Sequence, residues 1–371
     1  MKKERDFSLN IPLLIICGVV FVIFGITIFF TTPLTYLLKL KPDLRNINNS
    51  ALEVHFVDVG SADAILVKLP NDKKVIIDSG LSSYQKKLSY YINNVFFRND
   101  KDKTFDYAIL THSDSDHSGN FSFILDNYTV KNFYRPQIYS KEYDEEVLGG
   151  YVIEDSNYDK IISRLNKLSN QNKINVMYNF AGAETDEIKD YLTFLTPLKE
   201  VYGESNMYSP YILLKHKSKS VLLTGDATKE NEIELTNYYS NLNVDVLKIA
   251  HHGSSTSTSV EFLEYLNPKY AVISVGENNN NLPSLDTLNN IKNYSEDLYK
   301  NLYITKDRGN IIYYVNSDEN SGFLTIKNVN SYVFVDYYLI ALAVMGTCLT
   351  IVFFPKFKKK DDESSHKNKN D

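Results

Sequence analysis

The sequence predicts a layered α/β domain that lies between two apolar segments, one near each end of the chain. Short runs of β-forming residues alternate with helical patterns throughout residues 51–330. The strand-like runs fall into two groups with helices between them, which implies a layered α/β fold. On either side of this body stands an apolar stretch long enough to cross a bilayer.

The first apolar segment is predicted to be a transmembrane helix over residues 11–34. A cytoplasmic N-terminus of residues 1–10 precedes it, and a linker of residues 35–50 follows. Residues 7–38 carry no charge, and Ile11–Phe30 alone would cross a hydrocarbon core of about 30 Å. A secretory signal peptide is the rival interpretation. Because the apolar core is too long and TTPLTY offers no small-x-small cleavage site, an uncleaved anchor is favoured.

A second transmembrane helix is predicted over residues 331–355, followed by a basic, charged cytoplasmic tail of residues 356–371. The stretch Val333–Phe354 has a single charge, Asp336, near its outer edge. Four lysines follow it, at positions Lys356, Lys358, Lys359 and Lys360. By the positive-inside rule this flank is cytoplasmic, and two spans then place the N-terminus inside as well. We therefore expect a plasma-membrane protein whose body, residues 51–330, is extracytoplasmic.

The body begins with strands and continues as a mixture of strands and helices. In its first half, strands are predicted at Leu52–Val59, Asp63–Leu69, Val75–Gly80 and Phe105–Leu110, and a helix at Tyr84–Phe97. The stretch Asp126–Gly203 is less regular and has one helical segment, Tyr158–Leu168. In the second half, strands are predicted at Tyr211–Lys217, Ser220–Asp226, Val244–Ala250 and Tyr270–Val275, and helices near Lys229–Tyr238 and Val260–Tyr265.

Composition excludes several classes of function. The net charge of −6 gives no global basic footprint for nucleic-acid binding, although a local basic groove stays open. The only cysteines, Cys17 and Cys348, lie in the two apolar segments. The body therefore has neither a disulfide framework nor a thiolate metal site.

The loop LTHSDSDHSGN, Leu110–Asn120, concentrates groups that can bind a cation. It follows a buried strand and carries four of them, His112, Asp114, Asp116 and His117. Imidazole and carboxylate are the ligands that zinc and manganese favour. If the loop is extended, the first three project alike while His117 points elsewhere, so one loop could serve two metals. An Asp- and Ser-rich surface turn with incidental histidines is the disfavoured alternative.

Two later strand ends supply further candidates. Asp226 follows a buried strand in LLTGDA, and His251 and His252 follow another in IAHHGS. Strand ends are where a rigid scaffold places functional groups. By itself Asp226 would be read as a turn residue, and one of the paired histidines could be structural. Asp58 and Asp63 are interpreted as residues that shape the first turn, and His55 and His216 as ordinary packed or surface residues.

These motifs resemble the metallo-β-lactamase superfamily, whose His-x-[His/Asp]-x-Asp-His signature stands here as residues 112–117. The body, over roughly residues 52–315, is more closely similar to the external hydrolase domain of ComEC/Rec2-type DNA-uptake proteins. The shared pieces, in that family's order, are HFVDVGSADAILVKLPNDKKVIIDSG, LTHSDSDHSGN, VLLTGDA, VLKIAHHGSSTSTS and AVISVGENNN. The resemblance implies an αββα four-layer sandwich and a hydrolase site with two divalent metal ions, Zn²⁺ first and Mn²⁺ second.

The resemblance also implies roles for individual residues. His112 and Asp114 would hold one metal; Asp116, His117 and one of His251 and His252, with His252 favoured, would hold the other. Asp226 would bridge the two metals, and Asp116 and Asp226 are the catalytic candidates. Asp78 would orient a ligand histidine. Phosphate oxygens would be received by four candidates, Lys248, Ser254, Ser255 and Thr256. A flexible polar loop over Ser254–Ser259 is an equally good interpretation.

The chain departs from the family pattern at three positions. Leu282 precedes Pro283 where a histidine is usual, Ala62 replaces a turn glycine, and Ser255 stands where lysine is common. The many-helix channel portion of the uptake proteins has no counterpart in residues 1–371, so we do not expect this chain to form the DNA channel.

The leading hypothesis is a membrane-anchored extracytoplasmic hydrolase of phosphodiesters, with nucleic acid as one candidate substrate. One alternative is an esterase of a phosphorylcholine- or teichoic-acid-type cell-surface polymer. Another is a membrane-tethered scaffold whose site has decayed, and β-lactam hydrolysis ranks last. Protein partners are not indicated.

Overall fold

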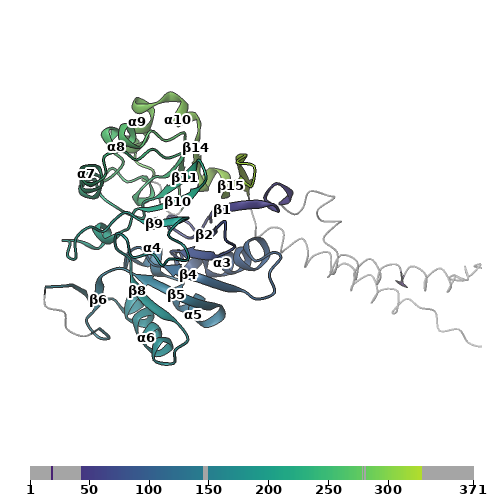
Figure 1. Ribbon diagram of the computed structural model, residues 1–371, viewed down its shortest axis with the longest axis vertical. Helices are drawn as coiled ribbons and strands as arrows, with labels where there is room; N and C mark the ends of the chain where they lie inside the picture. Colours follow the sequence, from purple (N-terminus) through teal and green to yellow (C-terminus); the bar gives the residue numbers. More distant parts are fainter. Residues whose placement is uncertain (1–17, 20–42, 145–148, 278, 280, 328–371) are drawn as a thin grey trace, which may run out of the picture. The chain divides into compact units, whose positions relative to one another are not determined.

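Two β-sheets pack face to face in the computed structural model, and helices cover the outer face of each (Figure 1). The structure describes residues 18, 19, 43–144, 149–277, 279 and 281–327. Residues 44–327 lie within one compact unit, and the helix–sheet–sheet–helix order confirms the predicted four-layer sandwich.

The first sheet is formed by eight strands of the described residues, in the order β16-β15-β1-β2-β3-β4-β5-β8. Their bounds are β1 Ser50–Phe56, β2 Ile65–Lys68, β3 Lys74–Ile77, β4 Thr104–Ile109, β5 Thr129–Arg135, β8 Asn175–Tyr178, β15 Asn310–Asn316 and β16 Ser321–Ile326. The polar turn after Leu69 makes β2 and β3 an antiparallel hairpin, with Ile65 opposite Ile77. From β3 to β8 the strands are parallel, so β4 ends on the same edge as its neighbours.

The second sheet contains six of the described strands, in the order β14-β13-β12-β11-β10-β9. They are β9 Leu192–Phe194, β10 Ile212–His216, β11 Lys219–Leu223, β12 Val246–Lys248, β13 Tyr270–Ile273 and β14 Leu302–Ile304. β11 to β14 are parallel. A separate parallel pair joins β6 (Ile138–Ser140) to β7 (Tyr151–Ile153).

Helices of the described chain complete the layers. The helices on the first sheet are α3 Gln85–Tyr91, a π-helical turn Ile92–Phe96, α4 Ser115–Ser118, α5 Phe121–Asn127 and α6 Ser156–Asn170. Those on the second sheet are α7 Lys229–Tyr238, α8 Val260–Leu266, α9 Leu285–Tyr294, α10 Glu296–Lys300 and α11 Thr305–Arg308. The predicted helix Lys229–Tyr238 is confirmed with its bounds, because Thr228 and Asn231 form a capping box at its start. The predicted helix Tyr84–Phe97 is instead split at Ile92.

The core fills the space between the two sheets. Apolar side chains of the first sheet, such as Val54 and Val75, pack with those of the second, such as Leu214 and Val246. A second apolar cluster lies between the second sheet and helices α7 to α10. Alternation along each strand sends one set of side chains inward and the other toward the helices.

Helices of the described residues are all too short or too polar to cross a membrane. The predicted spans, residues 11–34 and 331–355, lie outside the described residues apart from 18 and 19. The predicted N-terminus, 1–10, and tail, 356–371, also lie outside them.

Candidate metal centre

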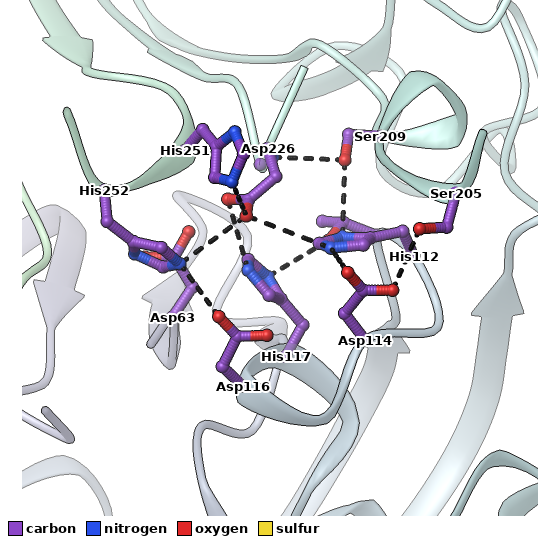
Figure 2. Close-up of polar contacts among 12 residues, drawn as sticks. Asp63, His112, Asp114, Asp116, His117, Ser205, Ser209, Asp226, His251 and His252 are labelled. Carbon is purple, nitrogen blue, oxygen red and sulfur yellow. Dashed lines mark hydrogen bonds and ion pairs between the residues drawn. The ribbon is translucent and has the colours of Figure 1, made fainter. Parts of the chain in front are cut away.

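Three loops, each following the carboxyl end of a strand, bring the candidate residues together. His112 follows β4, and His117 lies in the short helix α4. Asp226 follows β11, and His251 and His252 follow β12. Because β4 belongs to one sheet and β11 and β12 to the other, the side chains meet at the edge where both sheets end (Figure 2).

The buried carboxylate of Asp226 is the common neighbour of four histidines. Its Oδ1 lies 3.2 Å from Nε2 of His117. Its Oδ2 lies 4.0, 3.8 and 3.5 Å from the Nε2 atoms of His112, His251 and His252. Figure 2 shows the rings converging on this carboxylate from several sides. A carboxylate so placed could help to hold a divalent cation.

Each of these rings is held through its other nitrogen. Nδ1 of His117 donates to Asp78 at 2.7 Å, and Nδ1 of His252 donates to the carbonyl of Ser274 at 2.8 Å. His112 and His251 make their Nδ1 hydrogen bonds to the hydroxyls of Thr111 at 3.0 Å and Thr256 at 2.9 Å. Fixing Nδ1 in this way orients Nε2 toward a ligand, as is usual for metal-binding histidines.

The donors that face the centre have unmet hydrogen-bonding capacity. Within the described part of the chain, Nε2 of His112, His117 and His252 and Oδ1 of Asp226 are buried without a hydrogen-bond partner. Buried polar atoms are rarely left in this state. One ligand atom each from Asp116, His117, Asp226 and His252 lies within 4.8 Å of the others. This donor set fits a divalent cation of the zinc or manganese type.

Two aspartates line the side of the centre that is open to solvent. The side chain of Asp114 is 47% exposed; its Oδ2 lies 3.7 Å from Nε2 of His112, and its Oδ1 accepts a hydrogen bond from Ser205 at 2.9 Å. The side chain of Asp116 is 30% exposed, and its Oδ2 lies 3.2 Å from Nε2 of His252. These two carboxylates are therefore accessible from solvent.

The electrostatics of the centre favour bound positive charge. Burial acts to raise the pKa of Asp226, but the neighbouring His117 and His252 outweigh it and hold that pKa well below its usual range. Burial acts to lower the pKa of His117, but Asp226 and Asp78 raise it well above its usual range. His112 differs, because burial and then the charge of His117 lower its pKa.

The structure brings together all seven predicted ligands: His112, Asp114, Asp116, His117, Asp226, His251 and His252. Their metal binding stays a prediction. The paired histidines differ in placement. His252 is buried between Asp116 and Asp226, whereas the side chain of His251 is 28% exposed and its Nδ1 is bonded to Thr256. Both adopt positive φ values, 50° and 52°, a conformation that is uncommon for non-glycine residues.

The remaining predicted residues fall into three groups. Asp78 contacts His117 as predicted. Ser254, Ser255 and Thr256 lie beside His251 on the solvent side, and Thr256 bonds that ring. The prediction that Lys248 receives substrate oxygens is corrected: its side chain is fully buried, and its ammonium forms an ion pair with Asp63. A lysine side chain that is fully buried and ion-paired with a carboxylate cannot reach a substrate.

Sequence reasoning missed two kinds of contributor. Asp63, interpreted as a turn residue, lies with Asp78 and His117 in a second group of buried acidic and imidazole atoms within 4.8 Å of one another. Ser205 and Ser209 come from a stretch with no motif, yet Ser205 bonds Asp114 and the Ser209 hydroxyl accepts from the backbone N–H of Asp226 at 3.1 Å. The DVGSADA motif could have indicated that Asp63 contributes to the site, whereas no motif indicated Ser205 or Ser209.

Comparison with known proteins agrees with this geometry. Residues 57–277, more than half of the chain, match the model of the metallo-beta-lactamase superfamily. The chain is 32% identical over 247 residues to ComE operon protein 3 of Bacillus subtilis (strain 168), which covers 61% of this chain and 29% of that protein. It is 28% identical over 285 residues to Recombination protein 2 of Haemophilus influenzae, covering 74% and 30%. It therefore spans about three tenths of the length of these relatives.

A solved structure that is similar is that of the metallo-beta-lactamase fold protein YhfI from Bacillus subtilis. The TM-score is 0.43 at 12% identity, over 73% of this chain and 100% of that one. The extent of the superfamily match, together with the sandwich fold and its strand-end His/Asp cluster, leads to one conclusion: the chain belongs to the metallo-beta-lactamase superfamily and is related to ComEC/Rec2-type competence proteins.

Proposed function

We propose that this protein is a membrane-anchored, extracytoplasmic hydrolase that uses two divalent cations to cleave phosphodiester bonds. One observation carries the proposal. Three buried imidazole nitrogens without hydrogen-bond partners among the described residues, those of His112, His117 and His252, surround one buried carboxylate, Asp226. An arrangement of this kind is costly to bury unless a cation uses it.

The donors divide into two sets around Asp226. His112 and Asp114 would hold one cation; Asp116, His117 and His252 would hold the other, with Asp226 shared between them. Zn²⁺ is the first candidate and Mn²⁺ the second. A pair of such cations supplies an activated water and neutralises the charge that develops on a phosphoryl group.

The chain's own residues contribute orientation and proton acceptance. Burial acts to raise the pKa of Asp116, but the close contact with His252 and the charge of His117 hold it below the usual range, so this carboxylate is ionised at neutral pH. Its partial exposure lets it accept a hydrogen bond from an attacking water. Asp226, kept ionised by the same histidines, is the second acceptor.

Two further parts of the proposal rest on sequence and relatives. The anchoring helices and extracytoplasmic placement are inferred from two apolar segments, the uncharged residues 11–34 and residues 331–355 with the single charge of Asp336, and from the lysines after the second segment. Nucleic acid is the favoured phosphodiester because similar proteins carry the names Recombination protein 2 and, in Neisseria gonorrhoeae, Competence protein ComA.

The test is turnover by the purified full-length chain with added Zn²⁺ or Mn²⁺. A labelled single-stranded oligonucleotide and a chromogenic phosphodiester would be run beside an Asp226→Asn variant. We expect cleavage by the wild type and at least a hundredfold loss in the variant. A folded, metal-loaded protein inactive on every phosphodiester would contradict the proposal. Release of headgroup from purified wall polymer by that protein would favour the cell-surface esterase. A folded protein that binds no metal would favour the scaffold.

A further inference from the structure

We infer that the buried ion pair between Asp63 and Lys248 is a positioning element of the metal centre. It keeps in place the residues that would hold one cation, Asp116, His117, Asp226 and His252. It has less effect on His112 and Asp114, which would hold the other cation. The inference rests on the proposed function, because it concerns how that site receives its second cation. It also replaces the role in substrate binding that the sequence suggested for Lys248.

The pair joins the two halves of the sandwich directly beside the site. Asp63 stands just before β2 in the first sheet, whereas Lys248 is the last residue of β12 in the second. Their side chains are 1% and 0% exposed and in direct contact.

The backbone around the pair carries the ligand loops. The N–H of Asp63 donates to the carbonyl of Asp116 at 3.2 Å, and the carbonyl of Asp63 accepts from Gly80 at 2.7 Å. The Lys248 ammonium also donates to the carbonyl of Gly225 at 3.3 Å. Asp116 and Gly225 belong to the loops that supply the Asp116 and Asp226 ligands. Movement of either member of the pair therefore moves a ligand.

A third attachment runs through the same carbonyl. The carbonyl of Gly225 accepts the backbone N–H of His251 at 3.1 Å in addition to the Lys248 ammonium. The start of the His251–His252 turn is thus tied to the loop of Asp226. Among the residues that would hold the other cation, the shared Asp226 is tied to the pair through Gly225, whereas His112 and Asp114 make hydrogen bonds to Thr111 and Ser205. This asymmetry predicts that losing the pair affects one cation position more than the other.

The ammonium also has an electrostatic role. Asp63, Asp78 and His117 form a second buried group whose ligand atoms lie within 4.8 Å of one another. The Lys248 ammonium places a fixed positive charge against Asp63 in that group. This positive charge balances the negative charge of the Asp63 carboxylate. An incoming cation is therefore directed to the Asp226 side of the centre. A buried ion pair gains little stability over an apolar pair of similar volume, so a positioning role explains its presence better than stability does.

The experiment titrates Co²⁺ into the full-length chain and follows visible absorption and metal content. The test variant is Asp63→Asn/Lys248→Met, which removes both charges together and leaves no unpaired buried ion. The matched control is Glu53→Gln/Arg98→Met, which removes an ion pair between β1 and the turn after Ile92–Phe96, away from the seven candidate ligands. We expect the wild type and the control to bind two Co²⁺ ions.

In the test variant, the first Co²⁺ should bind with affinity within threefold of the wild type, and the second at least tenfold more weakly, with a changed absorption band. Equal weakening of both ions, or of neither, would overturn the inference while leaving the proposed function intact. A wild type that binds no Co²⁺ would overturn both. Should the double variant fail to fold, Lys248→Arg, which keeps the charge but shifts it, is expected to show the same selective loss.

Discussion

Replacing Asp78 by asparagine should weaken metal binding without disturbing the backbone. Asp78 adopts a left-handed conformation, φ 57°, which asparagine tolerates well. Its Oδ1 accepts the backbone N–H of Thr111 at 2.8 Å. Its Oδ2 accepts the Thr111 hydroxyl at 2.8 Å and Nδ1 of His117 at 2.7 Å. An amide can retain the first contact only by turning its NH₂ group toward the other two.

That reversal would change the protonation of two histidines. Facing an NH₂ donor, Nδ1 of His117 must become an acceptor, which places the ring proton on Nε2. The Thr111 hydroxyl, turned to accept from the amide, would donate to Nδ1 of His112 and have the same effect there. A protonated Nε2 cannot bind a metal. Loss of one charge-assisted hydrogen bond costs about 1.5–3 kcal/mol, which corresponds to roughly a 10- to 100-fold loss of affinity.

The assay is a competition titration of Zn²⁺ against a chromophoric chelator, using the full-length chain. Asp106→Asn is the matched control, since Asp106 is a mostly buried, ion-paired aspartate of β4 away from the ligands. We expect the control to bind Zn²⁺ within threefold of the wild type. If Asp78→Asn binds Zn²⁺ as tightly as the control, Asp78 does not determine the tautomers of His117 and His112.

Three further predictions concern stability. Gly119→Ala would place its Cβ 2.6 Å from two backbone carbonyl oxygens, so chemical unfolding should show a free energy of unfolding about 1–3 kcal/mol lower than that of the wild type. Gly203→Ala, whose Cβ would meet no atom within 4 Å, should change the free energy of unfolding by less than about 0.5 kcal/mol. Equal losses in the two variants would contradict this packing. Burial acts to raise the pKa of Glu53, but His55 and Arg98 lower it from 4.5 to about 2. The stabilising effect of this carboxylate is therefore complete above pH 4.5 and is lost as the pH falls toward 2. The difference in the free energy of unfolding between the wild type and Glu53→Gln should shrink over the same pH range. A difference that stays constant with pH would contradict the lowered pKa of Glu53. Zn²⁺ at a hundredfold its Kd should raise the free energy of unfolding by about 2.7 kcal/mol per site, and a chelator should reverse the gain; an unchanged unfolding midpoint would count against a metal centre.

The sequence predicted those parts of the fold that local patterns determine. The strands leading to the site and helix α7 were found because apolar periodicity and capping residues are local signals. The strands between Asp126 and Gly203 were missed. β5 carries the exposed Lys131 in its middle, and β9 is only three residues long, so both depend on pairing with neighbouring strands. Such pairing cannot be read from one segment alone.

The same distinction explains the candidate site. His112 and His117 stand close together in one loop, so their joint use could be predicted from spacing. The contact of Asp63 with Lys248 could not, because it forms only when the two sheets pack against each other. A strand-end lysine in isolation suggests a phosphate contact, and only its burial shows otherwise.

We propose that Asp226 would help to hold both cations. Native mass spectrometry of the full-length chain loaded with Zn²⁺ tests this proposal beside the Asp226→Asn variant. We expect two Zn²⁺ ions on the wild type and at most one on the variant. A wild type that binds a single ion, or a variant that retains both, would contradict it.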